Sequence, residues 1–165
     1  MTAPSASPSD GTSQSVRVER FFKPRPEGGP GRLPTCPTRP SWGELGLLAE
    51  EAAGALGIRA GAIMAEAGRG NCECLLAYHG WTPVGLALVL EGTAGMGERT
   101  LWLELMYVRP GAKGAAEALR SGAAEMGREQ GLPVLFLRRR QPGCQPGPHT
   151  RGIRRVGAIY QLEGE

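Results

Sequence analysis

Three apolar runs between residues 72 and 108 constrain the fold of this chain more than any other feature. The first two runs fill residues 72–90 and flank a short connection that contains glycine, His79-Gly80-Trp81-Thr82. Apolar runs on either side of such a connection predict an antiparallel β-hairpin. A glycine-rich break at 92–97 leads to the third run, 100–108, so the three runs together predict a meander of three strands.

The third run predicts a central strand that is buried on both faces. Its leucines occupy every second position, Leu101, Leu103 and Leu105, and Glu104 is the one charged residue among them. We therefore expect Glu104 to be buried. Because burial raises the pKa of a carboxylate, Glu104 is a candidate general base, and a structural ion pair with an arginine is the alternative.

Helices are predicted before and after this meander. Ser41 and Glu44 form a capping box, and apolar residues at spacings of three and four continue to Leu56, where Gly57 predicts the end of the helix. A second, weaker helix is expected at 60–67. The pattern turns helical again from 114 to 130, before Gly131.

The remaining elements are shorter. Alternating residues predict a first strand at 15–22, and an apolar stretch predicts another strand at 133–137. A glycine- and proline-rich loop at 141–148 then leads to a short basic helix at 150–156 and a last strand at 158–162.

The prolines are concentrated near the N-terminus. Eight of the fourteen precede residue 41, and six of these lie in 23–40. Residues 1–14 are small and polar, so we expect a disordered leader there. Since 165 residues suit one domain, residues 15–165 are expected to form a single domain in which 23–40 is an irregular loop.

The net charge of +3 does not by itself indicate nucleic-acid binding. Seventeen of the nineteen basic residues are arginines, and six of these fall in the last 28 positions. Those six are Arg138, Arg139, Arg140, Arg151, Arg154 and Arg155. Because the planar guanidinium suits phosphate, they favour an anionic ligand, and a solvated arginine-rich face is the alternative.

No stretch of 18 residues is apolar, and the first ten residues lack the charged and apolar regions of a secretory signal. We therefore expect a cytoplasmic protein without a membrane span, with its cysteines reduced. A zinc site can be drawn from Cys72, Cys74, Cys144 and His149. Their spacing matches no common zinc motif, so no metal is expected.

The end of the third run and the segment after it resemble the acetyl-CoA-binding core of the GNAT superfamily of N-acetyltransferases. The likeness lies in Glu104-Leu-Met-Tyr-Val-Arg-Pro110, followed by a loop of small residues, a helix and an apolar strand. The segment 78–85 is similar to that family's second-to-third strand hairpin, and 154–158 to the point where a short helix meets the last strand. The resemblance implies an α+β fold, with a mixed, mostly antiparallel central sheet flanked by helices.

The resemblance also implies a site. Tyr107 and Val108 would offer backbone hydrogen bonds to the pantetheine of acetyl-CoA. The residues that would hold its phosphates are Lys113, Gly114, Ala115 and Ala116. The physical argument agrees, because small residues at the start of a helix leave its first amides open to an anion.

The function that the resemblance implies is transfer of an acetyl group from acetyl-CoA to a primary amine of a small molecule or a protein. Glu104 is the expected base and Tyr160 the expected acid, with Tyr107 and His149 as further candidates for the acid. The alternative is a GNAT-like module without catalysis that binds nucleic acid or an acidic partner through its C-terminal arginines. It rests on the loop before the helix, which is shorter than is usual in the family and is followed by two alanines, Ala115 and Ala116, at positions that are often glycine.

Overall fold

The computed structural model describes residues 15–21, 40–95, 97–137, 153–156 and 159–162, the last two ranges as backbone. Their elements follow in the order β1 (Val16–Phe21), α1 (Trp42–Leu56), α2 (Ala60–Ala67), β2 (Cys72–His79), β3 (Thr82–Ala94), β4 (Glu98–Val108), α3 (Ala115–Gln130), β5 (Val134–Leu137), β6 (Ile153–Val156) and β7 (Ile159–Leu162). The predicted meander is present as β2, β3 and β4. The expected leader, 1–14, and the loop up to residue 39 lie outside the described residues.

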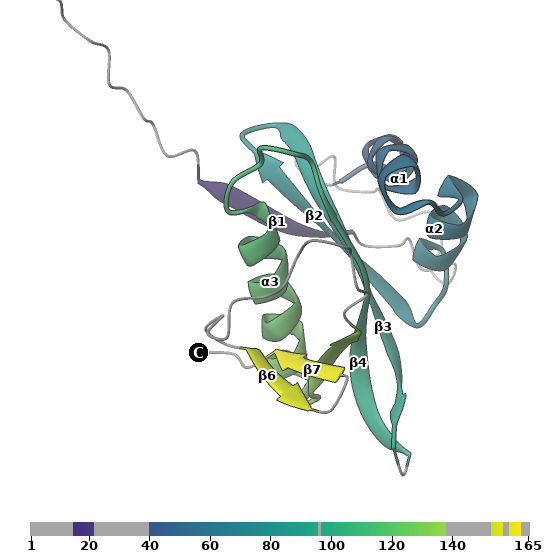
Figure 1. Ribbon diagram of the computed structural model, residues 1–165, viewed down its shortest axis with the longest axis vertical. Coiled ribbons are helices and arrows are strands. Elements are labelled where there is room, and N and C mark those ends of the chain that lie inside the picture. The colour runs from purple at the N-terminus through teal and green to yellow at the C-terminus, as the bar shows by residue number, and fades with distance from the viewer. Residues whose placement is uncertain (1–14, 22–39, 96, 138–152, 157–158, 163–165) are drawn as a thin grey trace, which may run out of the picture.

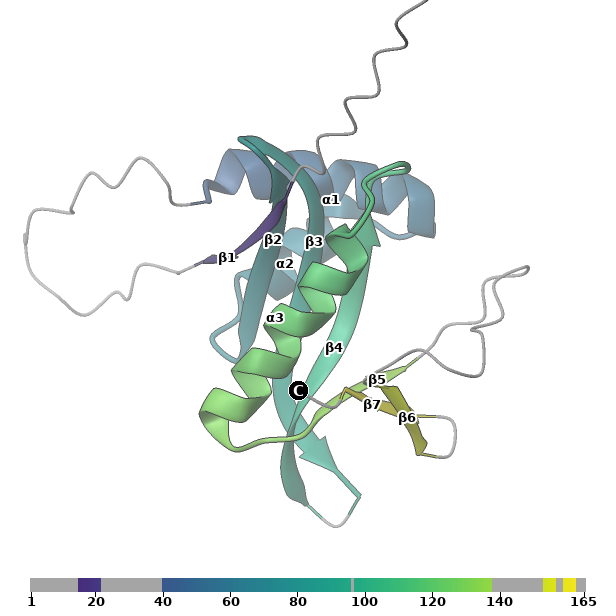
Figure 2. The ribbon, with the colours of Figure 1, turned by 90° about the vertical axis from the view of Figure 1, so that its left-hand side faces the viewer.

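One sheet joins all the strands, in the order β1-β2-β3-β4-β5-β7-β6. Every neighbouring pair is antiparallel except β4 and β5, which are parallel. Helices α1 and α2 cover one face and α3 covers the other, as Figures 1 and 2 show. The predicted α+β architecture, a mixed and mostly antiparallel sheet between helices, is therefore confirmed.

Each face of the sheet has its own apolar core. The α3 face includes Leu75, Val89 and Leu119, and the α1/α2 face includes Leu48, Leu76 and Leu86. Because both faces are covered, the strands at the centre are apolar on both sides, as their sequence predicts. In the described residues, no helix combines the length and the apolar composition that crossing a membrane requires.

Local signals set the ends of α1 as expected. The Ser41 amide donates to a Glu44 carboxylate oxygen at 2.7 Å, and the Glu44 amide donates to Ser41 Oγ at 3.2 Å. Gly57 ends the helix with a φ of 68°, in the left-handed region that glycine enters at no steric cost. The capping box and the glycine stop are both confirmed.

Strand β4 departs from its expected alternation at Glu104. Leu88 and Val89 are adjacent in β3, but their partners in β4 are Leu105 and Leu103. Glu104 is therefore the extra residue of a β-bulge, and beyond it the side chains change faces. Leu103 packs in the α3 core and Leu105 in the α1/α2 core. The expectations that these leucines share one face and that Glu104 is buried were wrong, since Glu104 is exposed.

The C-terminal segment also differs from its prediction. Residues 153–156 form strand β6, paired antiparallel with β7, where a short basic helix was expected at 150–156. The β-branched residues Ile153, Val156 and Ile159 favour strands. Pairing with β7 supplies the backbone hydrogen bonds of this segment, and its basic residues alone do not specify a helix.

Candidate active site

The sheet opens between β4 and β5. The two strands pair only where Leu101–Leu103 lie beside Val134–Phe136. Beyond Leu103, β4 continues to Val108 and turns away from β5, as Figure 2 shows. The bulge at Glu104 begins where the two strands separate. Among the described residues, the edge of β4 from 104 to 108 has no strand beside it on the β5 side.

The backbone of Val108 points into this opening. The Arg109 amide donates to the carbonyl oxygen of Val84 in β3 at 2.8 Å. Because successive residues of a strand direct their polar groups to opposite edges, Tyr107 also bonds towards β3, and the N–H and C=O of Val108 point the other way. Of the two residues expected to bond pantetheine, Val108 directs its backbone N–H and C=O into the opening, and the Tyr107 backbone is used within the sheet.

A turn of small residues connects β4 to α3. Gly111 and Gly114 have φ values of 85° and 79°, and Gly114 caps α3 without a side-chain hydrogen bond. Within the described part of the chain, no hydrogen bond occupies the N–H groups of Gly114, Ala116 and Glu117. Three backbone donors therefore meet at the N-terminus of α3, where the helix dipole favours an anion.

The four residues expected to hold phosphate do not play equal parts. Lys113 and Gly114 are exposed and Ala116 is half-buried, whereas Ala115 is fully buried in the α3 core. The Ala115 amide already donates to the Ala112 carbonyl oxygen at 3.3 Å. Ala115 therefore anchors the helix to the sheet, and the open donors belong to its neighbours.

A cluster that sequence reasoning missed joins α1 to the end of β4. The Arg109 guanidinium donates to both carboxylate oxygens of Glu51, at 2.7 and 2.6 Å. The Tyr107 hydroxyl donates to the same carboxylate at 3.4 Å. Nothing in the spacing of the sequence links Glu51 to Arg109. Glu44 and Glu51 are seven residues apart, which places both on one side of the predicted helix. Glu44 accepts from the Tyr78 hydroxyl, also at 3.4 Å.

The cluster alters the acidity of its members. Hydrogen bonds from Arg109 lower the pKa of Glu51, and they outweigh desolvation, which acts in the other direction. Burial, with the nearby Glu51 carboxylate, raises the pKa of Tyr107. At neutral pH the cluster therefore holds an ionised carboxylate, a guanidinium and a protonated phenol.

No family model matches this sequence, and no curated protein matches it. Solved structures do match in fold. A ribosomal-protein-alanine N-acetyltransferase from Brucella melitensis biovar Abortus 2308 is 16% identical over 86% of this chain and 99% of its own, with a TM-score of 0.56. The chain has the GNAT fold. An aminoglycoside acetyltransferase from an uncultured soil metagenomic sample is 14% identical over 78% and 82% of the two chains, with a TM-score of 0.53.

A transcriptional regulator from Bacillus halodurans C-125 has the same GNAT-like arrangement, at 16% identity over 78% of this chain and 85% of its own, with a TM-score of 0.56. These TM-scores establish a common fold, and the activity of this chain depends on its own site.

The remaining expected residues fall in or beyond the C-terminal part of this GNAT fold. The backbone of Tyr160 lies in β7, opposite Phe136 of β5. His149 and Cys144 lie outside the described residues, as do four of the six C-terminal arginines; the other two, Arg154 and Arg155, are in β6. Among the described residues, no group of three His, Cys, Asp or Glu side chains could hold a metal ion.

Proposed function

We propose that this protein is an N-acetyltransferase that moves an acetyl group from acetyl-CoA to a primary amine. One observation carries the proposal: β4 leaves β5 after Leu103, exposes the backbone of Val108, and runs on into the open N-terminal turn of α3. An opening of this kind offers a strand edge and an anion site in succession along one path. The acetyltransferase names of two structures with this fold support the same activity.

The residues present fit acetyl-CoA. Pantetheine carries amides, which suit the outward N–H and C=O of Val108. A pyrophosphate suits the open amides of Gly114 and Ala116, with the exposed Lys113 as a positive charge beside them. Glu117 carries a negative charge in the same turn, and its carboxylate pairs with Arg120 at 3.3 Å, which offsets its repulsion of an anion.

The chain's own residues supply the proton transfers. Bound acetyl-CoA would supply an activated acetyl thioester, and the acceptor amine must lose a proton to react with it. Glu104, at the point where β4 and β5 separate, is the base that accepts this proton. Because Glu104 is exposed, it works through water and without the help of burial that its sequence had suggested. One of two phenols, Tyr160 or Tyr107, would donate the proton that the departing thiolate of CoA needs. The raised pKa of Tyr107 keeps its hydroxyl protonated at neutral pH.

Thermal unfolding with and without acetyl-CoA tests the proposal first. A ligand that binds only the native state stabilises it, by about 2.7 kcal/mol at a concentration one hundred times its Kd. We expect the Tm to rise with acetyl-CoA or CoA, and thiol release from acetyl-CoA to begin when a suitable amine is added. An unchanged Tm at millimolar ligand, with no heat of binding, would overturn the proposal and leave a GNAT-like module without this activity.

A further inference from the structure

We infer that Glu51 and His79 are positioning residues, which hold the loop between β4 and α3 at its two ends and so preform the site for CoA. The inference rests on the proposed function, because it names what the held loop is for. Neither side chain belongs to the loop itself: Glu51 comes from α1, and His79 from the end of β2. Below, residues 109–114 are called the turn.

Glu51 holds the first end of the turn through Arg109. The Arg109 side chain makes two hydrogen bonds to Glu51, its amide bonds Val84 at 2.8 Å, and its carbonyl oxygen accepts from the Ala112 amide at 3.1 Å. Arg109 is therefore fixed to α1, to β3 and to the turn at once. Since Arg109 directly follows Val108, Glu51 also sets where the outward backbone of Val108 lies.

His79 holds the second end. Its Nε2 lies 3.2 Å from the carbonyl oxygen of Lys113. A carbonyl oxygen only accepts, so this ring nitrogen carries the hydrogen and donates it. Lys113 precedes Gly114, the left-handed residue that starts α3, and a Cβ at Gly114 would lie 3.5 Å from Val16 of β1. The end of β2 thus fixes the residue that presents the open amides.

The turn needs this support because its own sequence supplies little. Two of its residues are glycines at positive φ, and no side chain caps α3. Glycine has the largest conformational freedom of any residue, and a ligand that must order a mobile segment loses affinity to that ordering. Contacts from α1 and β2 order the turn before the ligand arrives.

The experiment compares Glu51→Gln and His79→Phe with the wild type. Glu51→Gln removes the carboxylate charge at nearly the same size, and His79→Phe removes the ring donor. We expect each to weaken CoA binding about tenfold in calorimetry. Amide hydrogen exchange of residues 109–117 in the free protein should become faster in both. His79→Gln, whose side-chain amide can restore the donor, should recover most of the affinity.

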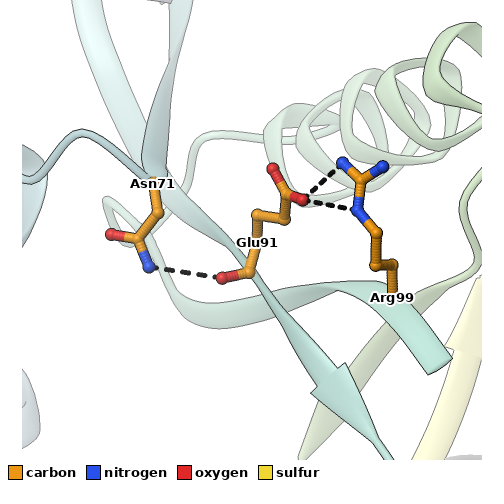
Figure 3. Close-up of polar contacts among 3 residues, drawn as sticks. All are labelled: Asn71, Glu91 and Arg99. Atoms are coloured by element: carbon orange, nitrogen blue, oxygen red, sulfur yellow. Dashed lines mark hydrogen bonds and ion pairs between the residues drawn. The ribbon is translucent and has the colours of Figure 1, made fainter. Parts of the chain in front are cut away.

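A matched control lies in the β3–β4 hairpin, at the end opposite to Arg109. Glu91 in β3 pairs with Arg99 in β4, and two Arg99 nitrogens donate to one carboxylate oxygen of Glu91, with Nε at 2.8 Å from it. The Glu91 backbone also accepts from the Asn71 side chain at 3.2 Å, as Figure 3 shows. Glu91→Gln should therefore leave CoA affinity and exchange in the turn unchanged, because it breaks a glutamate–arginine pair that lies away from Val108.

Pantetheine, used as a competitor of CoA, distinguishes the effect of Glu51 at the first end of the turn from the effect of His79 at the second end. Glu51→Gln should weaken both molecules, since it acts on Val108 as well as on the turn. His79→Phe should weaken CoA and leave pantetheine unchanged, because pantetheine has no pyrophosphate. Should Glu51→Gln fail to fold, Arg109→Lys, which keeps the charge and loses the paired geometry, replaces it.

Two failures are distinguishable. If the wild type binds CoA and both variants bind it equally well, with unchanged exchange in the turn, the inference is overturned and the proposed function stands. If the wild type binds no CoA, the proposed function fails, and the role assigned to the held turn fails with it.

Discussion

Gly85 of β3 lies so close to Tyr107 of β4 that a Cβ atom at Gly85 would stand 2.9 Å from the Tyr107 carbonyl oxygen. The same atom would meet Val108 and Leu119 side chains, each at 3.2 Å. The nearest of these contacts is backbone, which cannot move aside as a flexible side chain can. The absence of a side chain at residue 85 therefore sets how closely β3 approaches the strand that carries the candidate site.

Gly85→Ala is expected to lower stability by about 1–3 kcal/mol, the usual cost of overpacking a core. Because the displaced segment is Tyr107 and Val108, CoA binding should weaken as well. Urea unfolding and calorimetry measure the two effects. Gly54→Ala is the matched control, since nothing lies within 4 Å of a Cβ there. In an exposed helix interior, alanine is favoured over glycine by up to about 1 kcal/mol, so this control should stabilise the protein.

Glu104→Gln tests the proposed base. The two side chains are nearly isosteric and Glu104 is exposed, so the fold and CoA binding should be retained. Turnover should fall by about 10²-fold, the lower end of the range for general acid–base catalysis. The loss should shrink as pH rises, since more acceptor amine is then neutral. Unchanged turnover in the folded variant, across pH, would remove Glu104 from the proton transfer.

Lys113→Ala tests the proposed phosphate contact. Losing one charge-assisted hydrogen bond at an exposed position should raise the Kd of CoA roughly tenfold and leave the Tm of the free protein unchanged. Higher salt should reduce the difference, because it screens the lysine charge. Arg128→Ala, in the last turn of the same helix, is the control and should not alter affinity. Equal losses in both variants would indicate a general effect of charge.

The Glu51 carboxylate predicts a loss of stability in acid. Its pKa is lowered in the folded protein, from a usual 4.5, by the hydrogen bonds from Arg109. A lowered pKa means that the ionised form favours folding: the contribution is full above the unfolded pKa and is lost as pH falls through the folded pKa. Urea unfolding should show Glu51→Gln less stable than wild type at about pH 7, with the difference shrinking by about pH 3. A difference that stays constant with pH would contradict this assignment.

Much of the fold is encoded locally. The Ser41–Glu44 capping box and Gly57 specify the two ends of α1 through bonds that span a few residues, and the apolar runs around Gly80 specify the β2–β3 hairpin. These signals act through backbone geometry near the residues that carry them, so they could be recognised without knowing the rest of the fold. The position of Val108 could also be recognised locally, because it lies at the end of an apolar run.

The exposure of Glu104 could not be recognised in this way. Counting by twos along β4 places it inside a buried strand, but a bulge is defined by the partner strand, and β3 supplies one residue fewer between the same two pairs. The separation of β4 from β5 likewise depends on how far two strands, distant in sequence, remain paired.

The Glu51–Arg109 pair shows the same division between sequence and structure. By itself the sequence determined the helix that carries Glu51, the strand that ends before Arg109, and the glycines of the turn between β4 and α3. Only the tertiary structure brought together two residues 58 positions apart, with the Tyr107 hydroxyl beside them. The physical reason is that helix caps and hairpin turns are short-range, whereas an ion pair between layers forms only after α1 has packed on the sheet.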